Sequence, residues 1–415
     1  MTGLHDCGSE RRAPLSVEAA LALLLDQARP VSGCDTVGLD EALGRVLAEP
    51  LTSPIDQPAW DNSAMDGYAV RAADVTDTTE LSVSQRIAAG GRAEPLRPGT
   101  AARIFTGAPV PSGADTVVVQ EACEPLAGSR VRLPADIEPR RNIRYRGEQL
   151  RAGDSVLPPG VRLGPQHLAL AASVGAAALT VRRRLKVAIL ASGDELVAPG
   201  RPLREGQIYN SNRTLFHALL AGLGCEVIDL GIVPDTLDAT TGALAKGAAR
   251  ADLVLASGGV SVGDEDHVRP AVQQLGQLEI QSVAMRPGRP VAFGRIGATP
   301  FLGSPGNPVS LFVTFCLFAR PFIQRMQGLD PVPTPRRIQA AAGFDWPSPD
   351  KRREYQRARL VPGDNGMPRV EVFRSRSSAD IGSLTWADGL VELKERLGFR
   401  AGEPVSFIPF SELIP

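Results

Sequence analysis

The sequence predicts a multidomain protein of α/β and β class, built around a three-layer α/β domain with a mostly parallel sheet. Its 415 residues exceed the roughly 250–300 at which one hydrophobic core stops growing, so about two to four domains are expected. Between residues 185 and 328, apolar runs typical of buried strands alternate with helical patterns. From about residue 51 to 139, short β-branched runs are broken by glycine and proline, which indicates a separate β-rich domain.

Composition narrows the classes of function. The 45 Lys and Arg residues balance 46 Asp and Glu residues, so no bulk charge favours nucleic acid or an anionic membrane. The five cysteines are scattered without a Cys-x-x-Cys pair, which fits neither a disulfide framework nor a zinc site. The N-terminus lacks the apolar segment of a signal peptide, and the longest apolar run, 309–318, is too short to cross a bilayer. A soluble, cytoplasmic protein is expected.

The elements follow in order along the chain. A helix is expected over 17–27 with Ser16 as its N-cap, and another over 164–175 with Pro165 in its first turn and Gly175 as its stop. Alternating segments such as 369–373, after the proline-rich linker 331–335, suggest a small all-β domain. In the α/β domain, strands are expected at 186–190, 226–232, 253–256, 280–284, 291–293 and 301–302, and helices over 212–222 and 268–275 and from Pro308.

The most informative stretch is Ser257-Gly-Gly-Val-Ser-Val-Gly-Asp-Glu-Asp266, directly after the apolar run 253–256. Residues without a Cβ let backbone N–H groups approach a phosphate closely. Acidic residues in the same loop make electrostatic sense beside a phosphate when a cation, most consistently Mg²⁺, lies between them. The loop therefore suggests a phosphoanhydride substrate with a metal. The alternative is a tight strand-to-helix turn without a ligand.

Three further loops are expected at the same carboxyl edge of the sheet, where α/β domains bind ligands. They are 192–195, 234–236 and 303–308, and together with 257–266 they carry Asp194, Glu195, Asp235 and Asp266. Asn307 is a good N-cap and Pro308 fits the first helical position, so that loop presents helix N–H groups to an anion. These features predict a cation-bridged phosphate site. The alternative is that each acid only caps a helix or complements its dipole.

Two other segments have a functional and a structural interpretation. Arg286-Pro-Gly-Arg289 places two guanidinium groups on one turn, where they could bind a tetrahedral oxyanion or be merely solvated. The run Asp61-Asn-Ser-Ala-Met-Asp-Gly-Tyr68 has neither helix nor strand period. It could form a binding loop, or Asx turns could account for it.

Taken together, these segments resemble the molybdopterin molybdenumtransferases, the family of bacterial MoeA and the gephyrin E domain. The matching segments run in family order over nearly the whole chain, and the 61–68 octapeptide is highly specific. They are Asp-Asn-Ser-Ala-Met-Asp-Gly-Tyr (61–68), Phe-Thr-Gly-Ala-Pro-Val-Pro (105–111), Ser-Gly-Asp-Glu-Leu (192–196), Gly-Gln-Ile-Tyr-Asn-Ser-Asn (206–212), Ser-Gly-Gly-Val-Ser-Val-Gly (257–263) and Pro-Gly-Asn-Pro-Val-Ser (305–310).

The resemblance implies a molybdenum insertase. Adenylyl-molybdopterin is cleaved with Mg²⁺, AMP leaves, and the substrate molybdate is inserted into the dithiolene. It also implies an elongated homodimer with an active site shared between subunits, and contacts with the pathway adenylyltransferase and apo-molybdoenzymes. The implied domains are a discontinuous helical domain (1–50 and 142–182), a β-rich domain (51–141), the α/β molybdopterin-binding domain (183–330) and a C-terminal small β-barrel-like domain (334–415).

By motif position, the resemblance also assigns residues. The implied catalytic residues are Asp61, Thr106, Glu195, Asp235 and Asp266, of which Glu195, Asp235 and Asp266 would hold the metal. Molybdate would contact Arg286, Arg289, Arg353 and Ser378. The pterin phosphate and AMP would be bound by Ser257, Gly258, Gly259, Ser261, Gly263, Ser304, Pro305, Gly306, Asn307 and Pro308.

Some positions depart from the family pattern. Arginines at 286 and 289 replace the usual lysines, and they keep the charge but change the donor geometry. Ser282 stands where a lysine is common, Gln149 where an acid is expected, and Asp380 places a carboxylate in the usual serine-rich segment. These departures leave two alternatives open: a divergent non-catalytic paralogue that binds or carries the pterin, and a molybdopterin adenylyltransferase.

Overall fold

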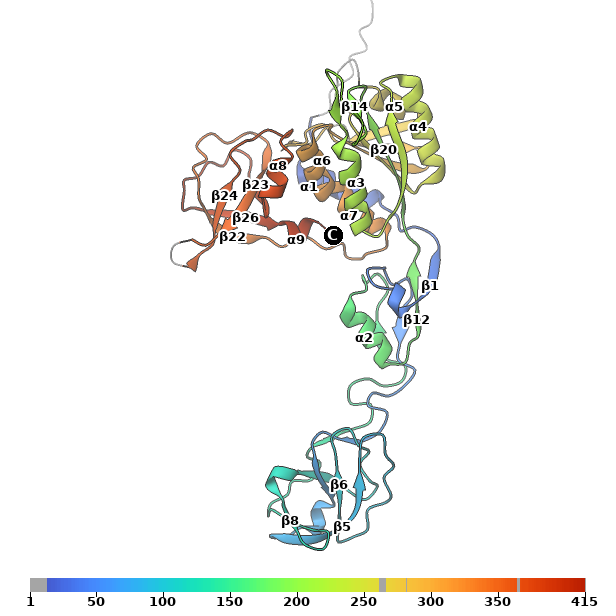
Figure 1. Ribbon diagram of the computed structural model, residues 1–415, viewed down its shortest axis with the longest axis vertical. Helices are drawn as coiled ribbons and strands as arrows, with labels where there is room; N and C mark the ends of the chain where they lie inside the picture. Colours follow the sequence, from blue (N-terminus) through green and yellow to red (C-terminus); the bar gives the residue numbers. More distant parts are fainter. Residues whose placement is uncertain (1–12, 261–265, 281, 364–365, 415) are drawn as a thin grey trace, which may run out of the picture.

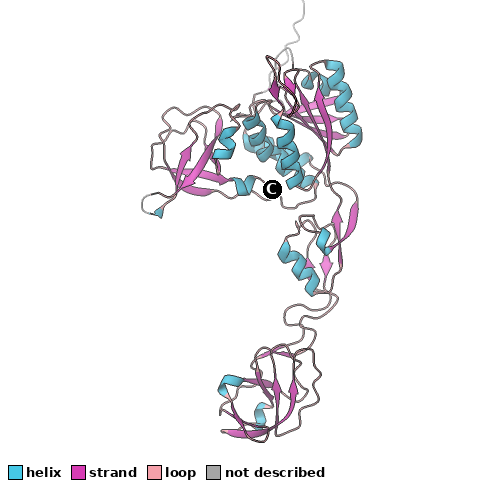
Figure 2. Ribbon diagram, in the orientation of Figure 1, coloured by secondary structure: helices cyan, strands magenta, loops and turns pink. Residues whose placement is uncertain are grey.

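The computed structural model describes residues 13–260, 266–280, 282–363 and 366–414. The molecule is elongated and hook-shaped (Figure 1). The α/β domain and the C-terminal β domain lie beside each other at one end, and a slender helical domain leads to the β-rich domain at the other. Most helices surround the α/β sheet, whereas the C-terminal and β-rich domains consist mainly of strands (Figure 2). The predicted multidomain fold class is confirmed.

The α/β domain is built on a six-stranded sheet with the order β16-β13-β17-β21-β20-β18. The first four strands run parallel, and β20 pairs antiparallel with both β21 and β18. Burial on both faces explains the unbroken apolar runs, because all of β17 and all but the first residue of β13 are buried. The bounds are β13 (Lys186–Ser192), β16 (Glu226–Val233), β17 (Leu253–Ser257), β18 (Gly276–Ile280), β20 (Ala292–Ile296) and β21 (Thr299–Ser304).

One strand lies earlier than the sequence predicts. The strand expected over 280–284 is β18, which ends at Ile280. It is an edge strand in which only the last residue is buried, so its apolar signal is weak. Three short strands complete this domain away from the main sheet: the pair β14 (Leu196–Val197) and β15 (Ile208–Tyr209), and β19 (Met285–Arg286).

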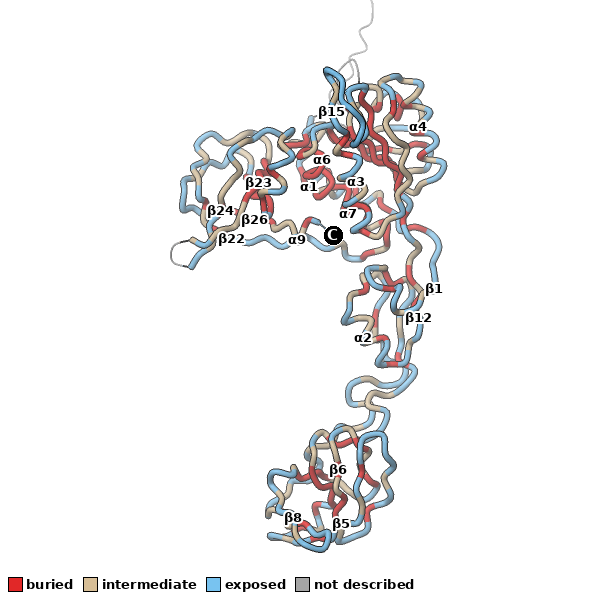
Figure 3. The backbone as a smooth tube through the Cα atoms, viewed as in Figure 1, coloured by how far each residue is buried: buried red, intermediate tan, exposed pale blue. Residues whose placement is uncertain are grey.

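Alternate residues of the strands face two helical layers. Val187 and Leu255 point into the core formed with α3, α6 and α7, whereas Ala188 and Val254 point into the core formed with α4 and α5. Figure 3 shows this buried interior at the sheet. The helices are α3 (Ser211–Gly222), α4 (Leu237–Arg250), α5 (Val268–Leu275), α6 (Pro308–Thr314), the π-helical segment η4 (Phe315–Ala319) and α7 (Arg320–Met326).

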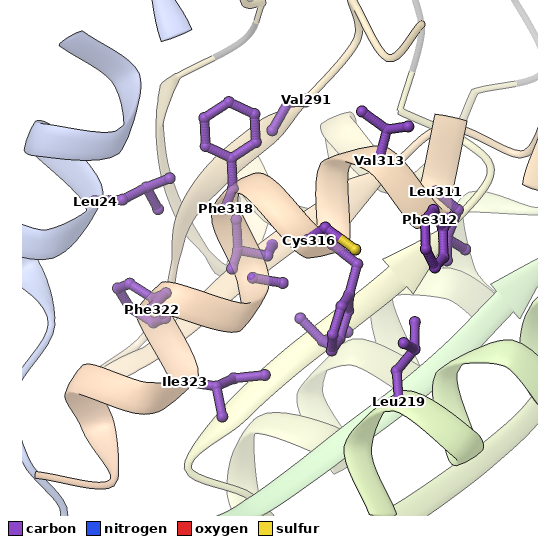
Figure 4. Packing of buried hydrophobic residues seen from close by; sticks show 14 of the residues in the cluster. Leu24, Leu219, Val291, Leu311, Phe312, Val313, Cys316, Phe318, Phe322 and Ile323 are labelled. Carbon is purple, nitrogen blue, oxygen red and sulfur yellow. The ribbon is translucent and has the colours of Figure 1, made fainter. Parts of the chain in front are cut away.

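The segment Pro308–Met326 is a core helix. By length and composition it could cross a membrane, but 89% of its most apolar window is buried inside the structure. The helix predicted from Pro308 is confirmed, and it is buried. Its partner is α1 (Val17–Gln27), which begins after the predicted N-cap Ser16. Figure 4 shows Leu24 of α1 beside Phe318 and Phe322.

The position of α1 corrects one expectation. Residues before about 50 were expected to pack with 142–182, yet α1 packs on the α/β domain. Its apolar face (Val17, Ala20 and Leu24) meets the phenylalanines of the core helix. Only the chain after α1 joins the helical domain.

The chain passes through the helical domain twice, once toward the β-rich domain and once back, and strands of the two passages pair antiparallel. We call this paired region the stem. In it β1 (Cys34–Gly38) pairs with β12 (Ala178–Arg182), and nearer the β-rich domain β2 (Leu51–Thr52) pairs with β11 (Ser155–Leu157). A small core of its own holds the two passages of chain together. The remaining elements are η1 (Leu39–Glu41) and α2 (Pro165–Ser173).

The β-rich domain contains a six-stranded sheet with the order β7-β4-β6-β5-β9-β8. Two apolar clusters fill its interior. Its strands are β4 (Gly67–Val70), β5 (Thr79–Ile87), β6 (Thr100–Ile104), β7 (Thr116–Val119), β8 (Glu124–Leu126) and β9 (Arg130–Leu133), with η2 (Ala72–Asp74) and η3 (Gln120–Ala122) between them and the pair β3 (Asn62–Ser63) and β10 (Ile143–Arg144) at its base.

The C-terminal domain is a closed barrel of five strands, because β23 pairs with both β24 and β25. The α/β domain adds β19 to its side through the parallel pairs Met285–Arg353 and Arg286–Glu354. The barrel elements are β22 (Ile338–Ala342), β23 (Arg353–Val361), β24 (Arg369–Val372), α8 (Gly382–Trp386), β25 (Gly389–Leu393), β26 (Pro404–Pro409) and α9 (Phe410–Leu413).

Candidate functional site

Four parallel strands end side by side at one edge of the α/β sheet. Ser192 lies opposite Val233, and Ser257 lies opposite Ala191 on one side and Ser304 on the other. The four loops singled out in the sequence all leave from this edge. In the order β16-β13-β17-β21 the connections diverge between β13 and β17, which is the switch point where such sheets bind ligands.

The two acidic loops at this edge are tied to each other. Both carboxylate oxygens of Asp235 accept hydrogen bonds, Oδ1 from Ser192 Oγ at 2.5 Å and Oδ2 from Asp194 N at 3.1 Å. Asp194 Oδ1 in turn accepts from Asp235 N at 3.1 Å. Asp194 and Asp235 therefore hold the loops after β13 and β16 together through these hydrogen bonds, and the N-cap of α4 is Thr236 rather than Asp235.

The described residues do not contain a preassembled three-ligand metal group. Mg²⁺ is usually held by one or two carboxylates together with substrate phosphates. Glu195 is exposed and follows Asp194, which is hydrogen-bonded to the half-buried Asp235. Asp266 lies two residues before α5. This set of oxygen donors fits an ion that binds together with its substrate.

The glycine loop begins with two residues that require glycine. Gly258 and Gly259 have φ of +84° and +64°, which L side chains rarely adopt. A Cβ on Gly258 would lie 2.7 Å from Ser192 O, so the loops after β17 and β13 pack backbone to backbone. Opposite them, a Cβ on Gly306 would meet only Gly258 Cα at 3.8 Å. Ser261 and Gly263 lie outside the described residues.

The start of α6 forms the third side of the edge. Asn307 is its N-cap and Pro308 its first residue, as predicted, although the Asn307 side chain makes no capping hydrogen bond. Val309 N donates to Ser378 O of the barrel domain at 3.0 Å. One of the N–H groups expected to face an anion is therefore occupied by a protein carbonyl.

Two asparagines of the 206–212 segment belong to this site, although the sequence analysis assigned them no role. Asn212 Nδ2 donates to Gly306 O at 2.7 Å, while its Oδ1 is buried without a partner in the described part of the chain. Asn210 accepts from Arg213 N at 3.1 Å, and its buried Nδ2 also has no described partner. A buried amide atom left unpaired is costly, so both atoms are candidates for ligand contacts. Their signal was the Asn-Ser-Asn repeat at the start of a helix.

The arginine turn lies at the seam between the α/β and barrel domains. Arg286 is in β19, and its Nη1 lies 3.9 Å from Asp350 Oδ2. Arg352 pairs with the same carboxylate at 2.6 Å, and this hydrogen bond holds the pKa of Asp350 well below its usual range. Arg289 is exposed. At this seam Arg286 also lies opposite Glu354 of β23.

Arg353, which the resemblance assigns to molybdate, lies among carboxylates in this structure. Its guanidinium pairs with Glu18, with Glu392 at 3.2 Å and with Glu395 at 3.1 Å. These carboxylates neutralise its charge and tie α1 to the barrel. These contacts give Arg353 a structural role as a link between α1 and the barrel.

Comparison with known proteins identifies the family. Three family models match in order: MoeA N-terminal region (domain I and II) over 15–175, "Probable molybdopterin binding domain" over 188–325, and MoeA C-terminal region (domain IV) over 339–410. A molybdopterin molybdenumtransferase of Haemophilus influenzae is 37% identical over 96% of this chain and 100% of its own length. The chain belongs to the MoeA family. It is therefore an enzyme of molybdenum cofactor biosynthesis.

Other relatives agree with this assignment to the MoeA family. A molybdopterin molybdenumtransferase of Nostoc sp. is 40% identical, covering 86% of this chain and 84% of the relative. The solved structure of a molybdopterin biosynthesis MoeA protein from Pyrococcus horikoshii OT3 is 29% identical. Its TM-score is 0.82, and the match covers 96% of this chain and 100% of that one.

We call the sheet edge at Ser192, Ser257 and Ser304 the serine edge. In this MoeA protein the octapeptide 61–68 lies in the β-rich domain, at the opposite end of the molecule from the serine edge (Figure 1). Asp61 Oδ1 accepts from Arg146 N at 2.8 Å. Thr106 is held by Asp66, whose Oδ1 accepts from both Thr106 N and Thr106 Oγ1 at 2.8 Å. The backbone and hydroxyl hydrogen bonds of Thr106 lower the pKa of Asp66. Asp66, which the sequence analysis assigned no role, therefore positions Thr106.

One departure from the MoeA pattern has a structural explanation. Arg357 is buried in the barrel, where its burial lowers the pKa of the guanidinium and the nearby Asp380 charge opposes that effect. Asp380 therefore compensates a buried cation. Gln149 is exposed, and its N–H donates to Gln57 O at 3.0 Å. Nothing in the structure explains why glutamine stands at 149.

Proposed function

We propose that this protein is a molybdenum insertase that cleaves adenylyl-molybdopterin, inserts molybdate into the dithiolene and releases AMP. The observation that carries the proposal is the alignment of Ser192, Ser257 and Ser304 at the switch point of the sheet, beneath the Gly258 and Gly306 loops. Backbone N–H groups and small side chains at such an edge suit a phosphoanhydride. The buried amide atoms of Asn210 and Asn212 offer further contacts to the substrate.

Mg²⁺ is part of this proposal. The carboxylates that would hold it are Glu195, Asp235 and Asp266, together with the substrate phosphates. Bound there, the ion would neutralise charge on the phosphoanhydride. The protein's own contribution is to orient the phosphates through the serine and glycine loops.

Molybdate would bind at the seam between the α/β and barrel domains. Arg286 and Arg289 supply planar donors that suit a tetrahedral oxyanion. Asp350 already pairs with Arg352 and lies 3.9 Å from Arg286. Its charge therefore tunes how strongly Arg286 attracts the oxyanion, and Ser378 supplies a hydroxyl from the barrel side.

We further propose that Asp61 and Thr106 act across a homodimer, each β-rich domain serving the serine edge of its partner. The separation of these residues from the serine edge within one chain supports this arrangement (Figure 1). The enzyme would work in the cytoplasm, receive its substrate from the pathway adenylyltransferase and deliver the cofactor to apo-molybdoenzymes.

The deciding experiment follows AMP release from adenylyl-molybdopterin, with and without Mg²⁺ and molybdate, while cofactor is assayed by reconstitution of an apo-molybdoenzyme. We expect molybdate-dependent AMP release that is lost in Asp266→Asn and kept in Asp238→Asn, a matched change on exposed α4 surface. Tight pterin binding without turnover would instead indicate a carrier. Formation of adenylyl-molybdopterin from ATP would indicate an adenylyltransferase.

Mixing two inactive variants tests the shared site. Thr106→Val damages only the β-rich half and Asp266→Asn only the serine edge. If the site is shared, half of the random dimers are hybrids with one intact site each, which restores about a quarter of wild-type activity. No recovery after confirmed subunit exchange would place both halves in one subunit.

A further inference from the structure

A cavity of about 240 Å³ lies between the helical domain and the α/β domain, at the amino ends of the parallel strands. This is the end of the sheet opposite the serine edge, because β13 begins at Lys186 beside the cavity and ends at Ser192. Five arginines contribute to its lining. They are Arg45, Arg162, Arg182, Arg183 and Arg184, and the rest of the lining is Leu43, Gly44, Val46, the end of α3 over 221–224, and Gln327.

Two of these arginines are neutralised within the chain. Arg45 pairs with Asp35 at 2.6 Å. Arg183 forms a two-fold pair with Asp252, in which Nη1 and Nη2 each lie 2.7 Å from a carboxylate oxygen. These two ion pairs form part of the cavity wall and add no net charge to it. The net positive charge of the cavity therefore comes from the other three arginines.

The remaining three have no carboxylate partner in the described part of the chain. Arg162 crosses the domain boundary, with Nη2 donating to Gln327 Oε1 at 2.7 Å and Nη1 to Gly44 O at 3.1 Å. Arg184 Nη1 donates to Gly224 O at 3.1 Å. The Arg182 stem lies against Gly328, 3.3 Å from where a Cβ would be, and its guanidinium makes no hydrogen bond to a described residue.

Other groups around the cavity do not supply the missing negative charge. The carbonyls at the end of α3 face it, but Leu223 O accepts from Gln327 Nε2 at 2.7 Å and Gly224 O from Arg184. Burial lowers the pKa of Arg162, and the neighbouring Arg320 adds a further positive charge. A half-buried cation without a counter-charge is unfavourable, and a bound anion would remove that penalty.

We propose that this cavity is a second anion site, which binds a small oxyanion of two negative charges between the helical and α/β domains. Guanidinium groups bind tetrahedral oxyanions through paired, charge-assisted hydrogen bonds. The cavity is smaller than the ~300–1,000 Å³ of sites for drug-sized ligands, which favours a single tetrahedral anion. Because Arg162 and Arg182 come from the helical domain and Gln327 from the α/β domain, the anion would fasten one domain to the other.

The test is calorimetric titration of the full-length protein with inorganic phosphate and, separately, with molybdate. The background is Arg289→Gln, chosen to weaken the anion binding proposed above for the seam. Arg182→Gln in this background should weaken binding roughly tenfold or more, because it removes charge-assisted hydrogen bonds. Arg369→Gln, whose arginine pairs with Glu371 on the barrel surface, is the matched control and should bind as the background does.

The site is supported if either anion binds and Arg182→Gln weakens that binding. The order of the two affinities then shows whether the site prefers phosphate or molybdate. Since Arg162→Gln could disturb the domain boundary, Arg162→Lys provides a second variant that keeps the charge. It should bind more tightly than Arg162→Gln at equal thermal stability. Absence of binding by both anions, or equal binding in Arg182→Gln and its background, would overturn the proposal. Neither result depends on insertase turnover.

Discussion

Val309 N, at the start of α6, donates a hydrogen bond of 3.0 Å to the carbonyl oxygen of Ser378 in the barrel domain. The serine loop that contains Ser378 is in turn held by the buried Arg357. Its Nη2 donates to Ser375 O at 2.6 Å and to Ser377 O at 3.1 Å. A buried cation in the barrel thus positions a loop that closes the serine edge of another domain.

Replacing Arg357 should disturb this edge from a distance. Arg357→Met keeps the bulk but leaves two carbonyls without their donor, so we expect a loss of about 1–3 kcal/mol in barrel stability. The amide protons of 375–378 and of Val309 should exchange with solvent faster. Arg369→Gln on the barrel surface serves as the control. Unchanged exchange at Val309 would show that the loop is held by other contacts.

Asp66 should be essential for positioning Thr106. Asp66→Ala removes the acceptor of both the backbone and the hydroxyl hydrogen bond, whereas Asp66→Asn keeps one acceptor oxygen. We expect activity to fall in the order wild type, Asn, Ala, while the thermal midpoint of the β-rich domain changes little because Thr106 is exposed. Equal activity in the Ala variant would remove Asp66 from the site.

Two glycines with nearly equal φ separate backbone strain from close packing. Gly231 has φ +82°, and a Cβ at this position would meet nothing within 4 Å. Gly231→Ala should therefore cost only the left-handed conformation, about 1–2 kcal/mol. Gly258→Ala adds a collision with Ser192 O and should cost more. It should also impair AMP release, because it pushes two loops of the edge apart. Denaturant unfolding of both variants checks the difference.

Thiol labelling tests burial in three domains at once. Burial raises the pKa of Cys225 and of Cys316 to about 12 and that of Cys123 to about 11. At pH 8 their reactive thiolate is on the order of one part in a thousand or less. In a Cys7→Ser background, only the exposed Cys34 should react quickly. Raising the pH toward 11 should first increase labelling of Cys123. Fast reaction of two thiols at pH 8 would contradict this assignment.

Local patterns predicted the elements well and their partners less well. The helix Val17–Gln27 begins after the predicted N-cap Ser16, because capping and helical period are local properties. Its packing on Phe318 and Phe322, about 300 residues away, depends on tertiary contacts that an apolar stripe does not specify. The edge strand β18 was misplaced for a related reason, since a half-exposed strand carries little apolar signal.

For the candidate site, too, the local features could be predicted from the sequence and the long-range contacts could not. Four loops were predicted at one sheet edge because parallel strands align their carboxyl ends, and the register of Ser192, Ser257 and Ser304 places them there. The roles of Arg353 and Asp66 could not be predicted in this way. Arg353 is neutralised by Glu18 from a helix 335 residues earlier in the chain, and Asp66 acts on Thr106, 40 residues later.

The antiparallel stem has a consequence for how the molecule can change. Its pairings are nested, so the chain leaves along one strand of each pair and returns along the other. The β-rich domain is therefore a side branch rather than a link between its neighbours. A short turn joining 52 to 155 would delete the β-rich domain without cutting the chain between α1 and the barrel. Another domain could be inserted at the same position.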